Sequence, residues 1–197
     1  EISLGLVGSE MCIRDRTGKP AKDPYYYAGL YYLQEPSAMT PANRLSPEPG
    51  DYVLDLCAAP GGKSTQIGDA MQGKGILVCN EIHPARAKIL SENVERMGLT
   101  NAVVTNESPE RLSAYFPEYF DKILVDAPCS GIGLIRRKPD IKYNKESADF
   151  VSLQAIQLAI LDSVCQSVRK GGIIVYSTCT IMGKENFEVV DQFLIHH

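Results

Sequence analysis

The sequence lacks several features that would place it in other classes of protein. No apolar run is long enough to cross a bilayer, so we predict that the chain is not an integral membrane protein. No basic segment precedes the first apolar residues, and Gly5 and Gly8 interrupt them, which argues against a secretory signal. None of the six cysteines forms a Cys-x-x-Cys pair, which argues against a zinc site or a disulfide framework. We therefore predict a cytoplasmic protein that holds no metal.

The chain also lacks an excess of basic residues. Its formal net charge of −4 at pH 7 argues against a generally basic nucleic-acid surface, though not against a local basic patch. The chain has 197 residues, of which 44% are hydrophobic, and this is enough for one domain with a real core.

The first part of the chain is interpreted separately from the rest. Residues 1–16 resemble translated adaptor or cloning sequence, the alternative being a genuine N-terminal segment, and we exclude them from the functional interpretation. Residues 17–45 are expected to form a linker and an N-terminal helical segment, with a helix from Ser37. The five tyrosines between residues 25 and 32 either pack onto the domain or offer a stacking surface. Residues 46–197 are expected to form the main folded domain.

Apolar segments alternate with helical patterns in this main part. Helices are predicted at 84–97, ending at Gly98, and at 147–169, after which residues 170–172 should turn the chain into a strand. Such alternation predicts an α/β, Rossmann-like fold with a mostly parallel sheet and helices on both faces. Ligands bind beyond the carboxyl ends of the strands in such sheets. The predicted strands are 52–57, 75–81, 102–106, 122–128 and 172–180.

The stretch VLDLCAAPGGKST, residues 53–65, follows the first predicted strand and resembles a phosphate-binding P-loop. Gly62, Lys63 and Ser64 satisfy the end of the pattern G-x-x-x-x-G-K-[ST], but Cys57 stands where its first glycine should be. The small residues still allow the backbone to approach a ligand. Glu81 ends the second strand, where a carboxylate can accept both hydroxyls of a ribose, the alternative being a solvated acid. This combination favours an adenosyl ligand over a triphosphate.

Two cysteines follow neighbouring strands and are predicted to face one crevice. Asp126 ends the fourth strand and is followed by Cys129, and Cys179 lies at the end of the fifth strand. Paired thiols beside an adenosyl ligand suggest thiol chemistry, whereas Cys57, Cys79 and Cys165 are interpreted as packing residues.

Four stretches, DLCAAPGGKST, NEIHPARA, DAPCSG and YSTCT, together resemble the RNA (cytosine-5) methyltransferases of the Sun/RsmB/RsmF (NOL/NOP/Sun) family. The resemblance covers residues 25 to about 194, with 25–130 most similar to the RsmF type and 131–194 to the RsmB type, as in a composite sequence or an unfamiliar branch. It implies a Rossmann-like methyltransferase fold with 46–197 as the catalytic domain. It also implies S-adenosyl-L-methionine as cofactor and RNA as substrate, with small-subunit ribosomal RNA expected.

The resemblance implies a role for each residue that matches a motif of the family. Cys179 matches the nucleophile that attacks carbon 6 of cytosine, Cys129 matches the thiol that aids product release, and Asp126 matches the acid near the base. Ser108 stands where the family has an acidic residue on the adenine side, which is a departure from the pattern. The cofactor-binding residues implied are Cys57, Ala58, Ala59, Pro60, Gly61, Gly62, Lys63, Glu81, Ser108 and Asp126.

Family domains also continue with a further strand pair and usually carry an RNA-binding domain. Neither is recognised in this chain, so we expect truncated C-terminal strands, an exposed sheet edge and weak RNA affinity. A basic loop after Cys129 is expected to hold the RNA backbone, or else to be an ordinary solvated loop. Nothing in the sequence indicates an obligate protein partner. A P-loop NTPase and a non-catalytic fragment that binds cofactor or RNA remain as alternatives. The RNA-binding residues expected in the loop are Arg136, Arg137, Lys138 and Lys142, with Lys145 nearby.

Overall fold

The computed structural model describes residues 20–134 and 147–197. The predicted leader, residues 1–16, and the basic residues Arg136, Arg137, Lys138, Lys142 and Lys145 lie outside the described residues. The strands are β1 (Tyr52–Asp55), β2 (Ile76–Asn80), β3 (Ala102–Thr105), β4 (Phe120–Asp126) and β5 (Val168–Ser177). The α-helices are α2 (Pro24–Tyr27), α3 (Pro36–Leu45), α4 (Gly62–Met71), α5 (Pro84–Arg96), α6 (Pro109–Tyr115), α7 (Ser147–Val164) and α8 (Phe187–His196). Short 3-10 turns are η2 (Pro20–Lys22), η3 (Ile132–Leu134), η5 (Cys165–Ser167) and η6 (Gly183–Glu185).

The strands form one sheet in the order β3-β2-β1-β4-β5, and each neighbouring pair is parallel. This confirms the predicted Rossmann-like α/β fold. The chain runs from β1 outwards to β2 and β3 on one side and then returns to β4 and β5 on the other. The order therefore reverses between β1 and β4, and such a switch point is where ligands bind in doubly wound sheets.

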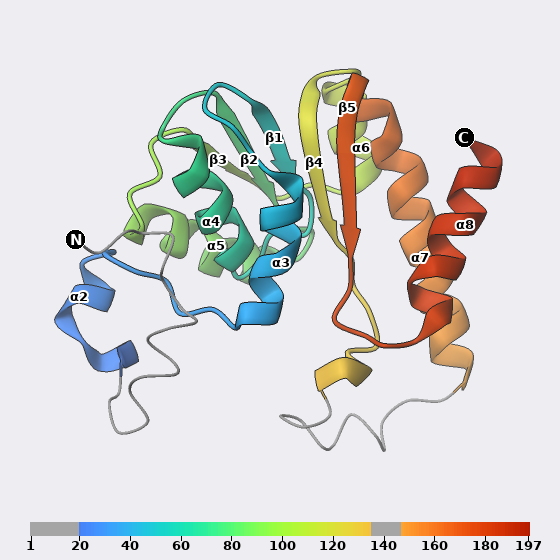
Figure 1. Cartoon of the computed structure of the whole chain (residues 1–197), viewed down its shortest axis with the longest axis horizontal. Helices are drawn as coiled ribbons and strands as arrows, with labels where there is room; N and C mark the ends of the chain where they lie inside the picture. The colour runs from blue at the N-terminus through green and yellow to red at the C-terminus, as the bar shows by residue number, and fades with distance from the viewer. Residues whose placement is uncertain (1–19, 135–146) are drawn as a thin grey trace.

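Helices cover both faces of the sheet because the strands are apolar on both sides (Figure 1). Alternate residues of a strand point to opposite faces. In β1, Val53 belongs to the core cluster under α3, α4 and α5, whereas Leu54 belongs to the cluster under α6, α7 and α8. In β4, Leu124 belongs to the first of these clusters and Ile123 to the second.

The helix predicted at 84–97 is α5, and the helix predicted from Ser37 is α3, which begins one residue earlier. Proline occupies the start of α3, α5 and α6, where a missing backbone N–H costs nothing. Gly98 follows α5 with φ +66°, a left-handed conformation that ends the helix. Among the described residues, no helix combines the length and the apolar character that a membrane span needs.

The region between α7 and β5 differs from the prediction. The predicted helix 147–169 ends at Val164, and β5 begins at Val168, ahead of the glycines that were expected to form the preceding turn. Val168 pairs with Phe120, so the strand has already started, and the register shifts between Phe120 and Lys122. Gly171, with φ +79°, therefore lies inside an irregular strand, because cross-strand pairing overrides the local turn signal.

Gly75, in the turn before β2, allows a test of the close approach between this turn and the backbone of Asp51. Alanine at this position should lower the free energy of unfolding more than alanine at Gly98. Both glycines have positive φ, +78° and +66°, so each substitution costs about 1–2 kcal/mol of backbone strain. A Cβ at position 75 would also lie 2.1 Å from the carbonyl oxygen of Asp51, whereas one at position 98 meets nothing within 4 Å. Urea denaturation should show that the free energy of unfolding of Gly75→Ala is lower than that of Gly98→Ala by at least about 1 kcal/mol. Equal free energies of unfolding for the two variants would contradict the described turn.

Candidate active site

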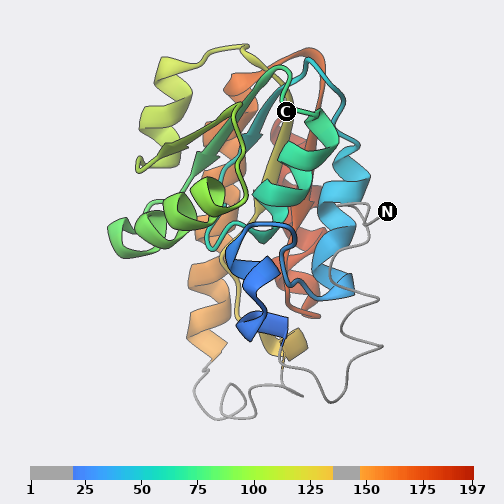
Figure 2. The ribbon, with the colours of Figure 1, turned by 90° about the vertical axis from the view of Figure 1, so that its left-hand side faces the viewer.

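A cavity lies at the carboxyl ends of β1 and β4, at the switch point of the sheet. Three segments line it: the chain before α3, the end of β1 with the loop that follows, and the end of β4. Both views of the ribbon place α2, and with it the start of this first segment, near the carboxyl-terminal end of the sheet (Figures 1 and 2). The lining residues are Tyr32, Leu33, Gln34, Glu35, Ala38, Asp55, Cys57, Ala58, Ala59, Pro60, Gly62, Lys63 and Asp126.

The loop after β1 is held close to the sheet by backbone hydrogen bonds. The N–H of Ala58 donates to the carbonyl of Asn80 at 2.8 Å, and the N–H of Gly61 donates to that of Ala58 at 2.8 Å. Gly62 faces the chain before α3, where a Cβ would lie 3.0 Å from Cε1 of Tyr32. The missing side chain at Gly62 therefore leaves room for the side chains of Tyr32 and Gln34 beside the cavity.

Asp55 is a residue of the site that sequence reasoning missed. It lines the cavity although its side chain is 0% exposed, and the Ser64 hydroxyl donates to its Oδ2 at 2.7 Å. Its Oδ1 has no partner among the described residues. Burial is the main reason that the pKa of Asp55 rises to about 7. The signal was present in the sequence, because a carboxylate inside an otherwise apolar strand is costly and needs a reason.

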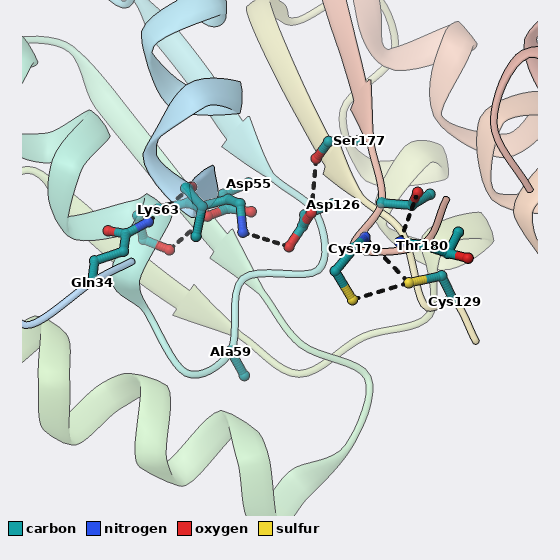
Figure 3. Close-up of polar contacts among 12 residues, drawn as sticks. Gln34, Asp55, Ala59, Lys63, Asp126, Cys129, Ser177, Cys179 and Thr180 are labelled. Carbon is teal, nitrogen blue, oxygen red and sulfur yellow. Dashed lines mark hydrogen bonds and ion pairs between the residues drawn. The ribbon is translucent and has the colours of Figure 1, made fainter. Parts of the chain in front are cut away.

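Lys63, Asp126 and Ser177 connect the first turn of α4 with the ends of β4 and β5. Lys63 Nζ lies 2.6 Å from Asp126 Oδ2, and the Ser177 hydroxyl donates to Asp126 Oδ1 at 2.7 Å. Both oxygens of Asp126 therefore have partners, which orients the carboxylate. Figure 3 shows Asp55, Lys63 and Asp126 in a row that leads towards the two thiols. The lysine of the P-loop-like stretch is thus bound to the end of β4.

Cys129 and Cys179 meet beside this row, as the sequence predicted. Their Sγ atoms are 3.2 Å apart, and the N–H of Cys179 donates to Sγ of Cys129 at 3.3 Å. The hydrogen bond from the Cys129 thiol is the main cause that lowers the pKa of Cys179 to about 7 and raises that of Cys129. Burial and the charge of Asp126 oppose this effect on the Cys179 pKa, and the charge of Lys63 favours it. The pair therefore provides one reactive thiolate near neutral pH, on the exposed residue Cys179.

The cavity lining does not include three of the predicted cofactor-binding residues, Gly61, Glu81 and Ser108. The Glu81 carboxylate is buried, accepts from the N–H of His83 at 3.0 Å and pairs with Arg86 at 3.2 Å. Ser108 caps α6, where its hydroxyl accepts from the N–H of Arg111. Both follow strands at the same edge of the sheet as the cavity, beyond β2 and β3.

The tyrosines of the N-terminal segment divide between packing and exposure. The Arg96 guanidinium lies 4.2 Å from the Tyr26 ring centre and donates to the Tyr26 carbonyl at 2.7 Å, which docks the segment onto α5. Tyr31 is buried, whereas Tyr25 and Tyr27 are exposed. Of the cysteines interpreted as packing residues, Cys79 is buried and Cys165 lies in η5 beyond the end of α7. Within the described ranges, no cluster of His, Cys, Asp or Glu is placed to hold a metal ion.

The family model for the 16S rRNA methyltransferases RsmB/F matches residues 42–197. The chain belongs to the RsmB/F family. The family match covers the cavity loop, Asp126 and both thiols, and it confirms the resemblance found in the sequence motifs.

Individual relatives that are named as rRNA methyltransferases are similar to this chain over most of its length. The probable ribosomal RNA small subunit methyltransferase B of Bacillus subtilis (strain 168) is 41% identical over 190 residues, covering 96% of this chain and 42% of the relative. The 26S rRNA (cytosine-C(5))-methyltransferase nsun-1 of Caenorhabditis elegans is 40% identical over 176 residues, covering 87% of this chain and 26% of the relative.

A solved structure shares both the fold and a clear sequence similarity. The crystal structure of NSun6 from Pyrococcus horikoshii with SFG superposes with a TM-score of 0.82 at 29% identity, covering 91% of this chain and 45% of that chain. The chain of this RsmB/F family member thus spans less than half the length of each of these relatives.

The hydrogen bond between the thiols predicts how Cys179 reacts with iodoacetamide. Its alkylation rate should reach half its limit near pH 7, because thiolate is the reactive form and is present above its pKa. Cys129→Ala removes the donor, so the midpoint should rise towards roughly 8.5, the usual value for a thiol. Cys129→Ser keeps a hydroxyl donor and should raise the midpoint less than Cys129→Ala does. Peptide mass spectrometry separates Cys179 from the other cysteines, and an unchanged midpoint in Cys129→Ala would disprove the interaction.

Proposed function

We propose that this chain is the catalytic part of an S-adenosylmethionine-dependent methyltransferase that forms 5-methylcytosine in small-subunit ribosomal RNA. The observation that carries the proposal is the pair of thiols 3.2 Å apart beside the Lys63–Asp126 ion pair. Membership of the family of 16S rRNA methyltransferases RsmB/F supports this substrate, and so does the relative named for small-subunit ribosomal RNA. The relative named for 26S rRNA supports ribosomal RNA as the substrate class and cytosine C5 as the position. The related NSun6 structure with SFG, an analogue of S-adenosylmethionine, supports the cofactor.

The residues around the cavity fit such a cofactor. Asp55 presents a buried carboxylate oxygen without a partner among the described residues, which suits the amino group of the methionine part. The cavity of about 230 Å³ is smaller than the roughly 300–1,000 Å³ usual for small-molecule sites. A ligand of this size would therefore extend along the strand ends towards β2 and β3, where Glu81 and Ser108 lie. We assign the ribose and adenine sides to these two residues. When bound, S-adenosylmethionine supplies an electrophilic methyl group.

The two thiols suit the activation of a cytosine ring. Carbon 5 of cytosine is a poor nucleophile until the Cys179 thiolate adds to carbon 6, which turns the ring into an enamine-like species. After carbon 5 has gained the methyl group, a base takes its proton, the double bond re-forms and Cys179 leaves as a thiolate. The Cys129 thiol stabilises the departing thiolate through the same hydrogen bond that joins the two sulfurs in the free protein.

Asp126 is placed to hold the base. Its carboxylate is fixed by Lys63 and Ser177, and it can accept a hydrogen bond from the amino group on the polar edge of a flipped cytosine. Lys63 orients Asp126 and contributes positive charge beside the Cys179 thiolate. The P-loop NTPase alternative receives no support, because Cys57 replaces the first glycine, Lys63 pairs with Asp126 and the family is that of methyltransferases.

Calorimetric titration with S-adenosylhomocysteine tests the cofactor, with magnesium-ATP run beside it. We expect binding of the former only, and Asp55→Asn should weaken it by about 10-fold or more, since it removes a charged partner of the amino group. Asp69→Asn, at a half-buried position of α4 that is not part of the cavity lining, is the matched control and should bind normally. Binding of magnesium-ATP alone would overturn the proposal.

Covalent trapping tests the thiols, using the protein with S-adenosylmethionine and a fragment of 16S rRNA. Cys129→Ala should accumulate a protein–RNA adduct that survives a denaturing gel, because release of Cys179 is slowed. Cys179→Ala should form no adduct and lose at least about 10³-fold in methyl transfer. Cys165→Ala is the control that should behave as the unmodified chain. Binding of S-adenosylhomocysteine without transfer or adduct would instead support a non-catalytic fragment.

A further inference from the structure

The thiols of Cys129 and Cys179 lie on two separate loops, so their contact depends on how these loops are held. Cys129 follows β4, and Cys179 follows β5. A distance of 3.2 Å between the Sγ atoms requires the loops to keep their relative position to within about half an ångström. We propose that Glu185 and Asn186, adjacent residues in and after η6, form a clamp that fixes both loops and thereby positions the thiol pair.

Glu185 holds the loop that carries Cys129. Its side chain is 0% exposed, and its Oε2 accepts a hydrogen bond of 2.8 Å from the N–H of Ser130, the residue next to Cys129. Gln157, on α7 and also 0% exposed, donates to the same Oε2 at 3.2 Å and to the carbonyl of Pro128 at 2.9 Å. The residues on both sides of Cys129 are therefore fixed by buried polar groups.

Asn186 holds the loop that carries Cys179. Its side-chain amide donates to the carbonyls of Thr180 at 3.1 Å and Met182 at 3.0 Å. Its Oδ1 accepts from the Thr178 hydroxyl at 2.6 Å. These three hydrogen bonds enclose Cys179 between fixed neighbours, as those of Glu185 and Gln157 enclose Cys129.

Two further hydrogen bonds complete the clamp. The Ser130 hydroxyl donates to the Thr180 hydroxyl at 2.9 Å, so the residues that follow the two cysteines are joined directly (Figure 3 shows Thr180 beside the thiols). The Tyr176 hydroxyl donates to the carbonyl of Glu185 at 2.8 Å and ties the clamp to β5. Ser130 and Thr180 are both buried, and buried hydrogen bonds resist displacement by water.

Stability alone is a poor explanation for Glu185. Burial of a carboxylate is expensive, and an apolar residue of similar size often stabilises a protein as well or better. One of its oxygens, Oε1, has no partner among the described residues, which adds to the cost. What a carboxylate provides at this position is a directional acceptor for two donors from different elements. Neither Glu185 nor Asn186 contacts the sulfur atoms in the described contacts, so both are positioning residues.

The test measures thiol geometry and stability separately in the free protein. Glu185→Leu removes the acceptor of Ser130 and Gln157, so the pH midpoint of Cys179 alkylation should rise by about one unit or more, with a lower melting temperature. Asn186→Ala should have the same direction of effect on the midpoint. Glu185→Gln keeps an acceptor oxygen and should restore the midpoint of the unmodified chain. If Glu185→Leu does not fold, Thr180→Val should still raise the midpoint, because it removes the hydroxyl that accepts from the Ser130 hydroxyl at 2.9 Å and from the N–H of Met182 at 3.2 Å.

Leu112→Ala is the control for a purely structural loss. Leu112 lies in the core cluster under α6, α7 and α8. Its truncation should lower the free energy of unfolding by about 2–5 kcal/mol while leaving the alkylation midpoint of Cys179 unchanged. The clamp is overturned if Glu185→Leu lowers the melting temperature without moving the midpoint, or if Glu185→Gln behaves like Glu185→Leu. The importance of the pair for methyl transfer rests on the proposed function. Alkylation requires neither RNA nor cofactor, so a failure of the clamp and a failure of that function are distinguishable.

Discussion

Strand β4 is hydrogen-bonded on both sides, to β1 and to β5, and the candidate site depends on this double pairing. Parallel strands end at the same edge of a sheet, so the loops after β1, β4 and β5 meet there. Asp126 ends β4 and is bonded to Lys63 on one side and to Ser177 on the other. A slip of one residue in β4 would turn Asp126 to the opposite face and separate Cys129 from Cys179. The hydrogen-bond ladder of the sheet thus determines the geometry of the candidate site.

The site combines acidic groups with a thiolate, which is an electrostatic conflict. The charge of Asp126 raises the pKa of Cys179, and burial does the same. The hydrogen bond from Cys129 outweighs both, with help from the charge of Lys63. Lys63 therefore has two effects, since it pairs with Asp126 and favours the ionised form of the nearby thiol. The lysine of this P-loop-like stretch therefore has interactions within the chain that require no triphosphate.

Sequence reasoning identified the strands and the residues that follow them, but it misplaced the boundary between α7 and β5. All five predicted strands are present, with bounds that differ from the predicted ones by at most four residues. The helix at 84–97 and the meeting of Cys129 with Cys179 are confirmed. The boundary after α7 was wrong, because Gly171 and Gly172 suggested a turn where pairing with β4 continues the strand. Such errors are expected where a local signal competes with cross-strand pairing, which joins residues far apart in the sequence.

The sequence by itself determined the fold class, because apolar segments alternate with helical patterns. It also indicated the edge of the sheet that carries the site and the two thiols, through the small residues after β1 and the cysteines after β4 and β5. These signals are local, because each depends on a short stretch of chain. Only the tertiary structure showed that Asp55 lines the cavity with an oxygen that has no partner in the described part of the chain. It also showed that Glu81 is paired with Arg86 and that Glu185 is buried against the loop of Cys129. The physical reason is that burial and hydrogen-bond partners are properties of segments brought together by folding, and no single segment contains them.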